Sequence, residues 1–226
     1  MYVVPQSQPP LLSVHDLHAA YAKKSVLRGV TFSVRAGEVV AVFGRNGSGK
    51  STLLKTISGI LPSQRGTVYF DGCDVTRATM YERHRMGIGF LMQGGRVFSN
   101  LTVAENLAVA LRGAGRKIDS SAVTPGFIFS DLFQRRHTPA GLLSGGQRQM
   151  IAIEMVLAQR PQLLLLDEPT SALSRDLSAR AIQAIAAFAR QSGASILVVE
   201  QNRADVRDVA SRTVVIHEGI ACHSVP

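Results

Sequence analysis

The run of residues 44–52, with the sequence GRNGSGKST, constrains the fold of this chain more than any other feature. It matches the pattern G-x-x-x-x-G-K-[ST] in full. A strand-like apolar run precedes it at residues 38–43, and a helix-like run follows it at residues 50–60. Glycines let the backbone wrap closely around an anion, and the N–H groups at a helix start face that anion. This order predicts a phosphate-binding loop in an α/β fold; a chance glycine-rich turn is the alternative.

All nine residues of the loop are candidates for contact with a bound nucleotide: Gly44, Arg45, Asn46, Gly47, Ser48, Gly49, Lys50, Ser51 and Thr52. The Lys50 ammonium is expected to neutralise the outer phosphates, and the Ser51 hydroxyl is expected to reach Mg²⁺.

A second motif places two carboxylates at the end of a buried strand. Four leucines at residues 163–166 are followed directly by Asp167 and Glu168. Open α/β sheets bind ligands at the carboxyl ends of their strands. Asp167 is therefore expected to hold Mg²⁺ through water, and Glu168 is expected to act as general base on the attacking water. Alone, the pattern is also typical of surface strands that end in acids.

A third motif, LSGGQ, occupies residues 143–147. Ser144 is a residue type that favours the N-cap of a helix, and Gly145 and Gly146 expose the backbone. With Gln147, these residues predict a second helix N-terminus suited to an anion, although an ordinary helix start would have the same sequence.

Taken together, the three motifs resemble the ABC ATPase family. Residues 143–147 are identical to the family signature, and the resemblance extends from Leu12 to Ile220. It implies one ABC ATPase domain over residues 1–226. The expected fold is an α/β P-loop NTPase with a RecA-like parallel-sheet core and an N-terminal antiparallel β part. A helical subdomain that carries the signature would be inserted at about residues 94–158.

The resemblance also implies roles for three residues outside these motifs. Tyr21 would stack on adenine, with a half-buried strand tyrosine as the alternative. Gln93 would contact the metal and the attacking water and couple to the membrane subunit, with a solvated loop residue as the alternative. Gln201 stands where most of the family has histidine. It would donate to the terminal phosphate, or it would merely cap the strand at residues 195–199.

In this family two chains pair head to tail, and each ATP lies between the phosphate loop of one chain and the signature of the other. A narrower resemblance, to the F-type ATPase of branched-chain amino-acid importers, rests on residues 94–98, 101–107, 149–153 and 199–202. Ser174 and Met155 depart from the wider pattern, which usually has Asp and Arg there. With the non-titrating Gln201, they put turnover and coupling between the two chains in question.

Composition limits the function classes. The longest apolar runs, at residues 39–43, 107–111 and 184–189, fall short of the roughly 20 residues of a membrane span. No secretory signal is expected at residues 1–10. Cys73 and Cys222 have no metal-ligand spacing, which predicts two free thiols. The net charge of +9 is scattered without a block of like charges, so no nucleic-acid partner is expected. Binding close to the anionic inner surface of a membrane is the better explanation of this positive charge.

The remaining expected elements follow from hydrophobic periodicity. Strands are expected at residues 12–21, 26–34, 66–70, 195–199 and 213–216, helices at residues 102–111, 147–159 and 177–191, and a loop at residues 113–126. The alternation of strands and helices in the last third predicts parallel pairing.

The expected function is that of an ATP-hydrolysing subunit of an importer for branched-chain or related amino acids, peripheral on the cytoplasmic face of the inner membrane. Its partners would be integral-membrane permease subunits, a second ATPase subunit of the same or a sister kind, and indirectly a periplasmic binding protein. The alternatives are a urea or amide importer, an ABC-type ATPase that acts on nucleic acid or ribosomes, and a nucleotide-binding regulator that hydrolyses little. The second of these usually has two cassettes or a long coiled coil, which this sequence lacks.

Overall fold

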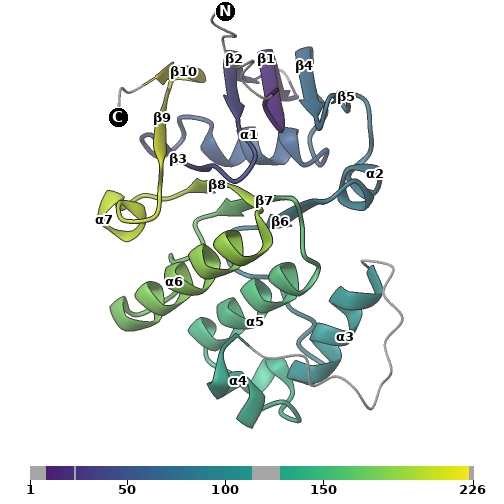
Figure 1. Ribbon diagram of the computed structural model, residues 1–226, viewed down its shortest axis with the longest axis vertical. Coiled ribbons are helices and arrows are strands. Elements are labelled where there is room, and N and C mark those ends of the chain that lie inside the picture. Colours follow the sequence, from purple (N-terminus) through teal and green to yellow (C-terminus); the bar gives the residue numbers. More distant parts are fainter. Residues whose placement is uncertain (1–8, 23, 114–127, 224–226) are drawn as a thin grey trace, which may run out of the picture.

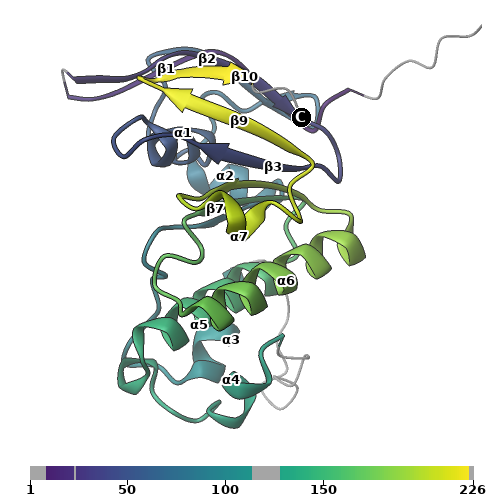
Figure 2. The ribbon, with the colours of Figure 1, turned by 90° about the vertical axis from the view of Figure 1, so that its left-hand side faces the viewer.

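The computed structural model describes residues 9–22, 24–113 and 128–223. Its strands form two sheets (Figures 1 and 2). The antiparallel sheet has the order β2-β1-β4-β5 and consists of β1 (Leu12–Tyr21), β2 (Lys24–Val34), β4 (Arg65–Phe70) and β5 (Cys73–Asp74). The larger sheet has the order β10-β9-β3-β8-β7-β6 and consists of β3 (Val39–Phe43), β6 (Ile88–Leu91), β7 (Leu163–Asp167), β8 (Ser195–Val199), β9 (Arg212–His217) and β10 (Ile220–His223).

The larger sheet confirms the expected parallel core. Strands β9, β3, β8, β7 and β6 pair in parallel, and β10 adds to β9 in the antiparallel sense. Every residue of β7 and β8 is buried. A parallel strand covered on both faces must be apolar throughout, which explains the run of leucines at residues 163–166.

Helices cover both faces of this sheet. Helix α1 (Lys50–Ile57) lies between the two sheets, and α5 (Gly145–Ala158) and α6 (Arg175–Ser192) cover the opposite face (Figure 1). Helices α3 (Val103–Gly113) and α4 (Ser130–Gln134) lie beyond α5, farthest from the antiparallel sheet (Figure 2). Each face thus has its own apolar core, one between the two sheets and one under α5 and α6.

Several element ends differ from the sequence-based expectation. Helix α1 ends at Ile57 rather than at residue 60, because Gly59 leaves the helical conformation with φ +82°. Helix α5 begins at Gly145 rather than at residue 147, directly after the N-cap Ser144. Helix α6 ends before Gly193, which has the left-handed conformation (φ +71°) that favours glycine after a helix.

Helix α2 (Met80–Arg85) was not predicted from the sequence. Its buried residue Arg83 caps the C-terminal end of α1. Arg83 is 3% exposed, and its Nη1 donates to the carbonyls of Thr56 at 2.8 Å and Ile57 at 2.7 Å. These carbonyls have no partner within α1, although Gly59 N, just after the helix, also donates to Thr56 at 3.2 Å. A guanidinium that satisfies them stabilises the negative end of the helix dipole, and burial lowers the pKa of Arg83.

Four further short elements were not predicted: α4, the 3₁₀ turn η1 (Ala140–Leu142), α7 (Arg203–Val206) and strand β10. Strand β6 was also missed. The expected loop at residues 113–126 lies outside the described residues, except that Gly113 ends α3. Cys73 and Cys222 are exposed and free, as expected. No helix in the described part of the chain is long and apolar enough to cross a membrane.

Candidate nucleotide-binding site

The loop between β3 and α1 requires glycine at specific positions. A Cβ atom at Gly44 would lie 2.3 Å from the carbonyl oxygen of Ile216 and 2.5 Å from Oγ of Ser48. Gly49, the N-cap of α1, has φ +110°, which side chains rarely adopt. The backbone of β9 therefore forces the loop to pass as bare backbone, and its N–H groups remain open to an anion.

Lys50 and Ser51 begin α1 and turn toward the end of β7. Lys50 is 5% exposed, and its Nζ donates to the carbonyls of Gly44 at 2.8 Å and Arg45 at 3.1 Å. The ammonium thus lies in the concave side of the loop. The Ser51 hydroxyl donates to Oδ1 of Asp167 at 2.9 Å. Burial raises the pKa of Asp167, the Ser51 hydrogen bond opposes this rise, and the neighbouring charge of Glu168 adds to it.

Glu168 occupies the position between two glutamines. Gln93 Nε2 donates to Oε2 of Glu168 at 2.7 Å, and Gln201 Nε2 donates to Oε1 at 2.9 Å. Gln93 follows β6 by two residues, Glu168 directly follows β7, and Gln201 follows β8 by two residues. These are three adjacent parallel strands, so the three side chains meet at one edge of the sheet.

A pocket of about 450 Å³ opens onto this edge. It is lined by Tyr21, Lys24, Val26, Asn46, Gly47, Gly49, Lys50, Ser51, Thr52, Gln93, Glu168 and Gln201. Tyr21 contributes from the end of β1 and is 45% exposed. The structure thus brings most of the predicted residues together. Lys24 and Val26 were not predicted; the only signal was their position in the hairpin next to Tyr21.

The predicted residues of the LSGGQ motif do not line this pocket. The Ser144 Oγ accepts from Gln147 N at 3.2 Å, and Gln147 Oε1 accepts from Ser144 N at 3.0 Å, which confirms Ser144 as an N-cap. Gly145 and Gly146 lie in the same first turn, and this end of α5 is at least partly exposed. Within one chain, the two predicted anion sites therefore remain separate.

The oxygen atoms of Ser51 and Asp167 are the candidate metal ligands. No group of three or more His, Cys, Asp or Glu side chains that could hold a metal occurs among the described residues. Mg²⁺ prefers oxygen ligands and is typically bound by one or two carboxylates plus substrate phosphates. One hydroxyl and one carboxylate fit that chemistry. The Gln93 amide, in contrast, donates its nitrogen to Glu168, so in this arrangement only its oxygen remains for a metal.

Comparison with known proteins identifies the family of this chain. The family model described as ABC transporter matches residues 27–171. The chain is 35% identical over 85% of its length to a probable branched-chain amino acid transport ATP-binding protein LivF from Archaeoglobus fulgidus, covering 82% of that protein. It is 31% identical over 92% of its length to the lipopolysaccharide export system ATP-binding protein LptB from Acidithiobacillus ferridurans, covering 87% of it.

Among solved structures, the ADP conformation of an ATP-binding cassette of an ABC transporter superposes with a TM-score of 0.80 at 26% identity, covering 95% of this chain and 90% of that one. The phosphate-binding loop follows β3, and the two acidic residues stand at the end of β7, two strands away in the same parallel sheet. This combination defines a nucleotide-binding P-loop ATPase. This chain belongs to the ABC transporter family. It is an ATP-binding, ATP-hydrolysing subunit, and such subunits work with membrane permeases.

Proposed function

We propose that Glu168 is the general base for ATP hydrolysis in this chain, and one observation carries this proposal. The carboxylate is 5% exposed at the pocket edge, and two amides fix both of its oxygens. A carboxylate held in this way can accept the proton of a water that attacks the terminal phosphate. Lys50 would neutralise that phosphate, and the oxygens of Ser51 and Asp167 would hold Mg²⁺, which supplies charge stabilisation when bound. Release of phosphate by the purified chain with Mg-ATP tests the proposal, and its absence would contradict it.

We further propose that a second chain completes the site. Ser144 and Gly145 are exposed at the start of α5, Gly146 and Gln147 are partly exposed, and none of the four lines the pocket of its own chain. Ser144, Gly145, Gly146 and Gln147 of one chain would bind the phosphates held by the loop of the other. Residues 94–158, which contain α3, α4 and α5, would then act as a helical subdomain within one domain of residues 1–226. The partner can be a second copy or a sister subunit.

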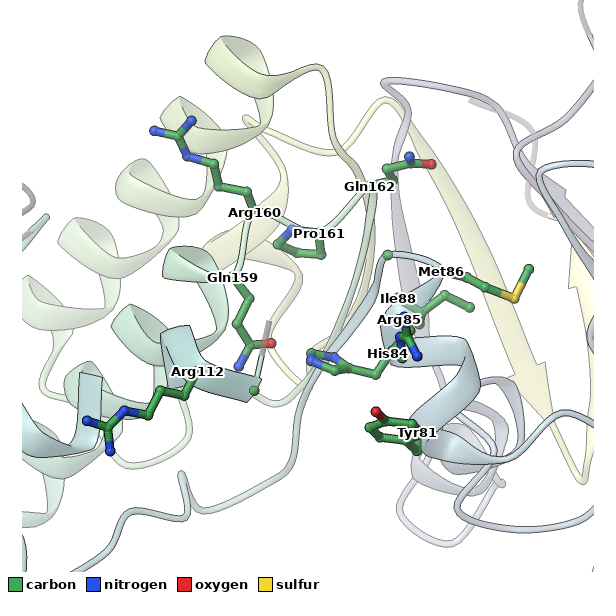
Figure 3. Close-up of a pocket in the computed structure, with 12 residues that line it drawn as sticks. Tyr81, His84, Arg85, Met86, Ile88, Arg112, Gln159, Arg160, Pro161 and Gln162 are labelled. Atoms are coloured by element: carbon green, nitrogen blue, oxygen red, sulfur yellow. The ribbon is translucent and has the colours of Figure 1, made fainter. Parts of the chain in front are cut away.

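A larger groove of about 650 Å³ is the proposed contact for the permease (Figure 3). It lies where α2, α3 and α5 end, and none of its lining residues is acidic. Its lining lacks a carboxylate or a glycine loop for phosphate chemistry, so it is not a catalytic pocket despite its size. His84 and Gln159 face each other across it, and Arg112 and Arg160 extend from its rim (Figure 3). A permease segment with acidic side chains would fit this charge.

Strand β6 connects this groove to the catalytic edge. Ile88 lines the groove, and the same strand ends at Leu91, two residues before Gln93. A shift of the residues that line the groove, caused by permease binding, would therefore be transmitted along β6 and would change the hydrogen bond between Gln93 and Glu168. The double variant Arg112→Glu/Arg160→Glu should lose co-purification with permease-containing membranes and keep its own ATPase rate. Arg190→Glu, an exposed charge reversal on α6, is the control. Unchanged membrane binding of the double variant would contradict this contact.

For the transported substrate, we propose branched-chain or related amino acids. The support is the F-type pattern of the sequence and the likeness to LivF. The likeness to LptB, an export-system protein, does not support import. The chain would be peripheral on the cytoplasmic face of the inner membrane and would serve a permease fed by a periplasmic binding protein. Uptake of labelled leucine into proteoliposomes with the neighbouring permease and binding protein tests this proposal. Transport of urea or lipopolysaccharide, without transport of leucine, would contradict it.

A further inference from the structure

Gln149 is a buried residue of α5 that the function above does not use. Its side chain is 1% exposed, and its Nε2 donates to the carbonyl oxygen of Pro169 at 2.9 Å. Its Oε1 is also buried and accepts no hydrogen bond among the described residues. A buried amide with only one end satisfied carries a desolvation cost, and the hydrogen bond from Nε2 to Pro169 fixes the side chain at its other end.

The other side of Gln149 is occupied by the backbone that follows Gln93. A Cβ atom at Gly95 would lie 2.2 Å from Oε1 of Gln149 and 3.0 Å from its Cα. Gly95 itself has φ +47°, and its N–H donates to the Met92 carbonyl at 3.3 Å, which closes the turn that carries Gln93. The bare backbone of this turn therefore rests directly on Gln149.

These contacts form a closed ring around the catalytic edge. Pro169 follows Glu168, and Gly95 lies two residues after Gln93. Glu168 and Gln93 are joined by the 2.7 Å hydrogen bond on the pocket side. On the side away from the pocket, Gln149 contacts the same two segments, at Pro169 and at Gly95. A shift of Gln149 along the axis of α5 would move both ends of that hydrogen bond together.

Helix α5 also carries the LSGGQ turn, and Gln149 lies only two residues after Gln147. We propose that Gln149 is a positioning residue that couples the two nucleotides of the paired chains. Binding of the partner's nucleotide at the start of α5 sets the position of Gln149, and Gln149 sets Gln93 and Glu168 for hydrolysis of the chain's own nucleotide. This inference rests on the proposed pairing of two chains.

The first test compares Gln149→Leu with Gln183→Leu, the same change at an exposed position of α6. Gln149→Leu leaves the Pro169 carbonyl without its donor. The expected result is an ATP affinity like that of the wild type, a kcat lower by about tenfold, and loss of the cooperative dependence of the rate on ATP concentration. The control should match the wild type in all three. A Gln149→Leu protein with wild-type kcat and cooperativity would overturn the inference.

Two further measurements keep the test independent of folding and of turnover. Gly95→Ala disturbs the same contact from the other side and should give the same kinetic signature, and its effect should be non-additive with that of Gln149→Ala. Hydrogen exchange, read without turnover, should show faster exchange at residues 92–95 in Gln149→Leu while α1 and β3 keep their protection. Unchanged exchange there would contradict the positioning role even if the wild type failed to hydrolyse ATP, a failure that would count against the proposed function instead.

Discussion

The side-chain amide of Gln201 donates to Oε1 of Glu168 at 2.9 Å. The sequence pattern predicts that Gln201 reaches a terminal phosphate or caps β8. The structure joins it to the carboxylate proposed as general base, opposite the bond from Gln93, and the contact with a terminal phosphate stays a prediction. An amide in this position orients the carboxylate and does not titrate.

Replacing Gln201 by alanine should lower kcat by about tenfold, because one oxygen of Glu168 loses its donor. The affinity for ATP should change little, since Lys50 and the loop remain. Gln201→His should retain more activity, because a neutral imidazole can still donate one N–H. It should also add a pH dependence near ~6.5 that the wild type lacks. Rate measurements across pH decide this, and a wild-type rate in the alanine variant would make Gln201 structural.

Lys50→Ala should weaken ATP binding by about 2–5 kcal/mol, because a buried charge-assisted contact to the phosphates is lost. This corresponds to at least ~30-fold in the dissociation constant. Titration with a fluorescent nucleotide measures it. Arg65→Ala removes an exposed cation that pairs with Asp16 and should bind ATP normally. Equal affinities for both variants would remove Lys50 from the phosphate site.

Glu168→Gln should bind ATP but hardly hydrolyse it, because an amide cannot accept the proton of the attacking water. Its ATP-bound form should accumulate as a pair of chains, since ligand held between two chains stabilises the pair. Size-exclusion chromatography with and without Mg-ATP would show the shift. A variant that turns over like the wild type would assign the base role to another group.

Glu154 should make the stability of the protein depend on pH. It is 3% exposed, its Oε1 accepts from Ile128 N at 2.5 Å, and burial raises its pKa from 4.5 to about 7. Because the folded state favours the protonated form, the contribution of Glu154 to the free energy of unfolding is greatest below pH ~4.5. It decreases as the pH rises to about 7, by at most about 3 kcal/mol.

The matched variant is Glu154→Gln, whose amide stays neutral. It should be more stable than the wild type at pH 8 and similar to it at pH 5, as measured by urea unfolding. The exposed Glu218→Gln is the control and should follow the wild type at both pH values. An equal loss of stability with pH in Glu154→Gln and the wild type would place the titration elsewhere.

The parts of the site that the sequence predicted are those in which neighbours in sequence act together. The loop before α1 and the acids after β7 are local motifs, and their order along the chain fixes their place at the sheet edge. The contacts of Glu168 were not predictable in this way. Its two donors are 75 and 33 residues distant. They meet only because β6, β7 and β8 are neighbours in the sheet, which the linear pattern does not reveal.

The missed elements have physical reasons of the same kind. Strand β6 has four residues and contains Gly89, where a Cβ atom would lie 2.9 Å from the ring of Pro161. Its strand character therefore comes from packing rather than from propensity. Helix α2 is short and polar, but Thr79 and Glu82 form a capping box that the pattern of a helix start could have revealed.

The backbone of Glu168 has φ +50°, which is a left-handed conformation for a residue with a side chain. Such a conformation costs on the order of 1–3 kcal/mol in the folded state. Glycine at this position would relieve the strain and would also remove the carboxylate. Selection for thermostability alone and selection for turnover therefore pull this position in opposite directions. Among descendants of this chain, a glycine here would mark a subunit released from the need to hydrolyse ATP.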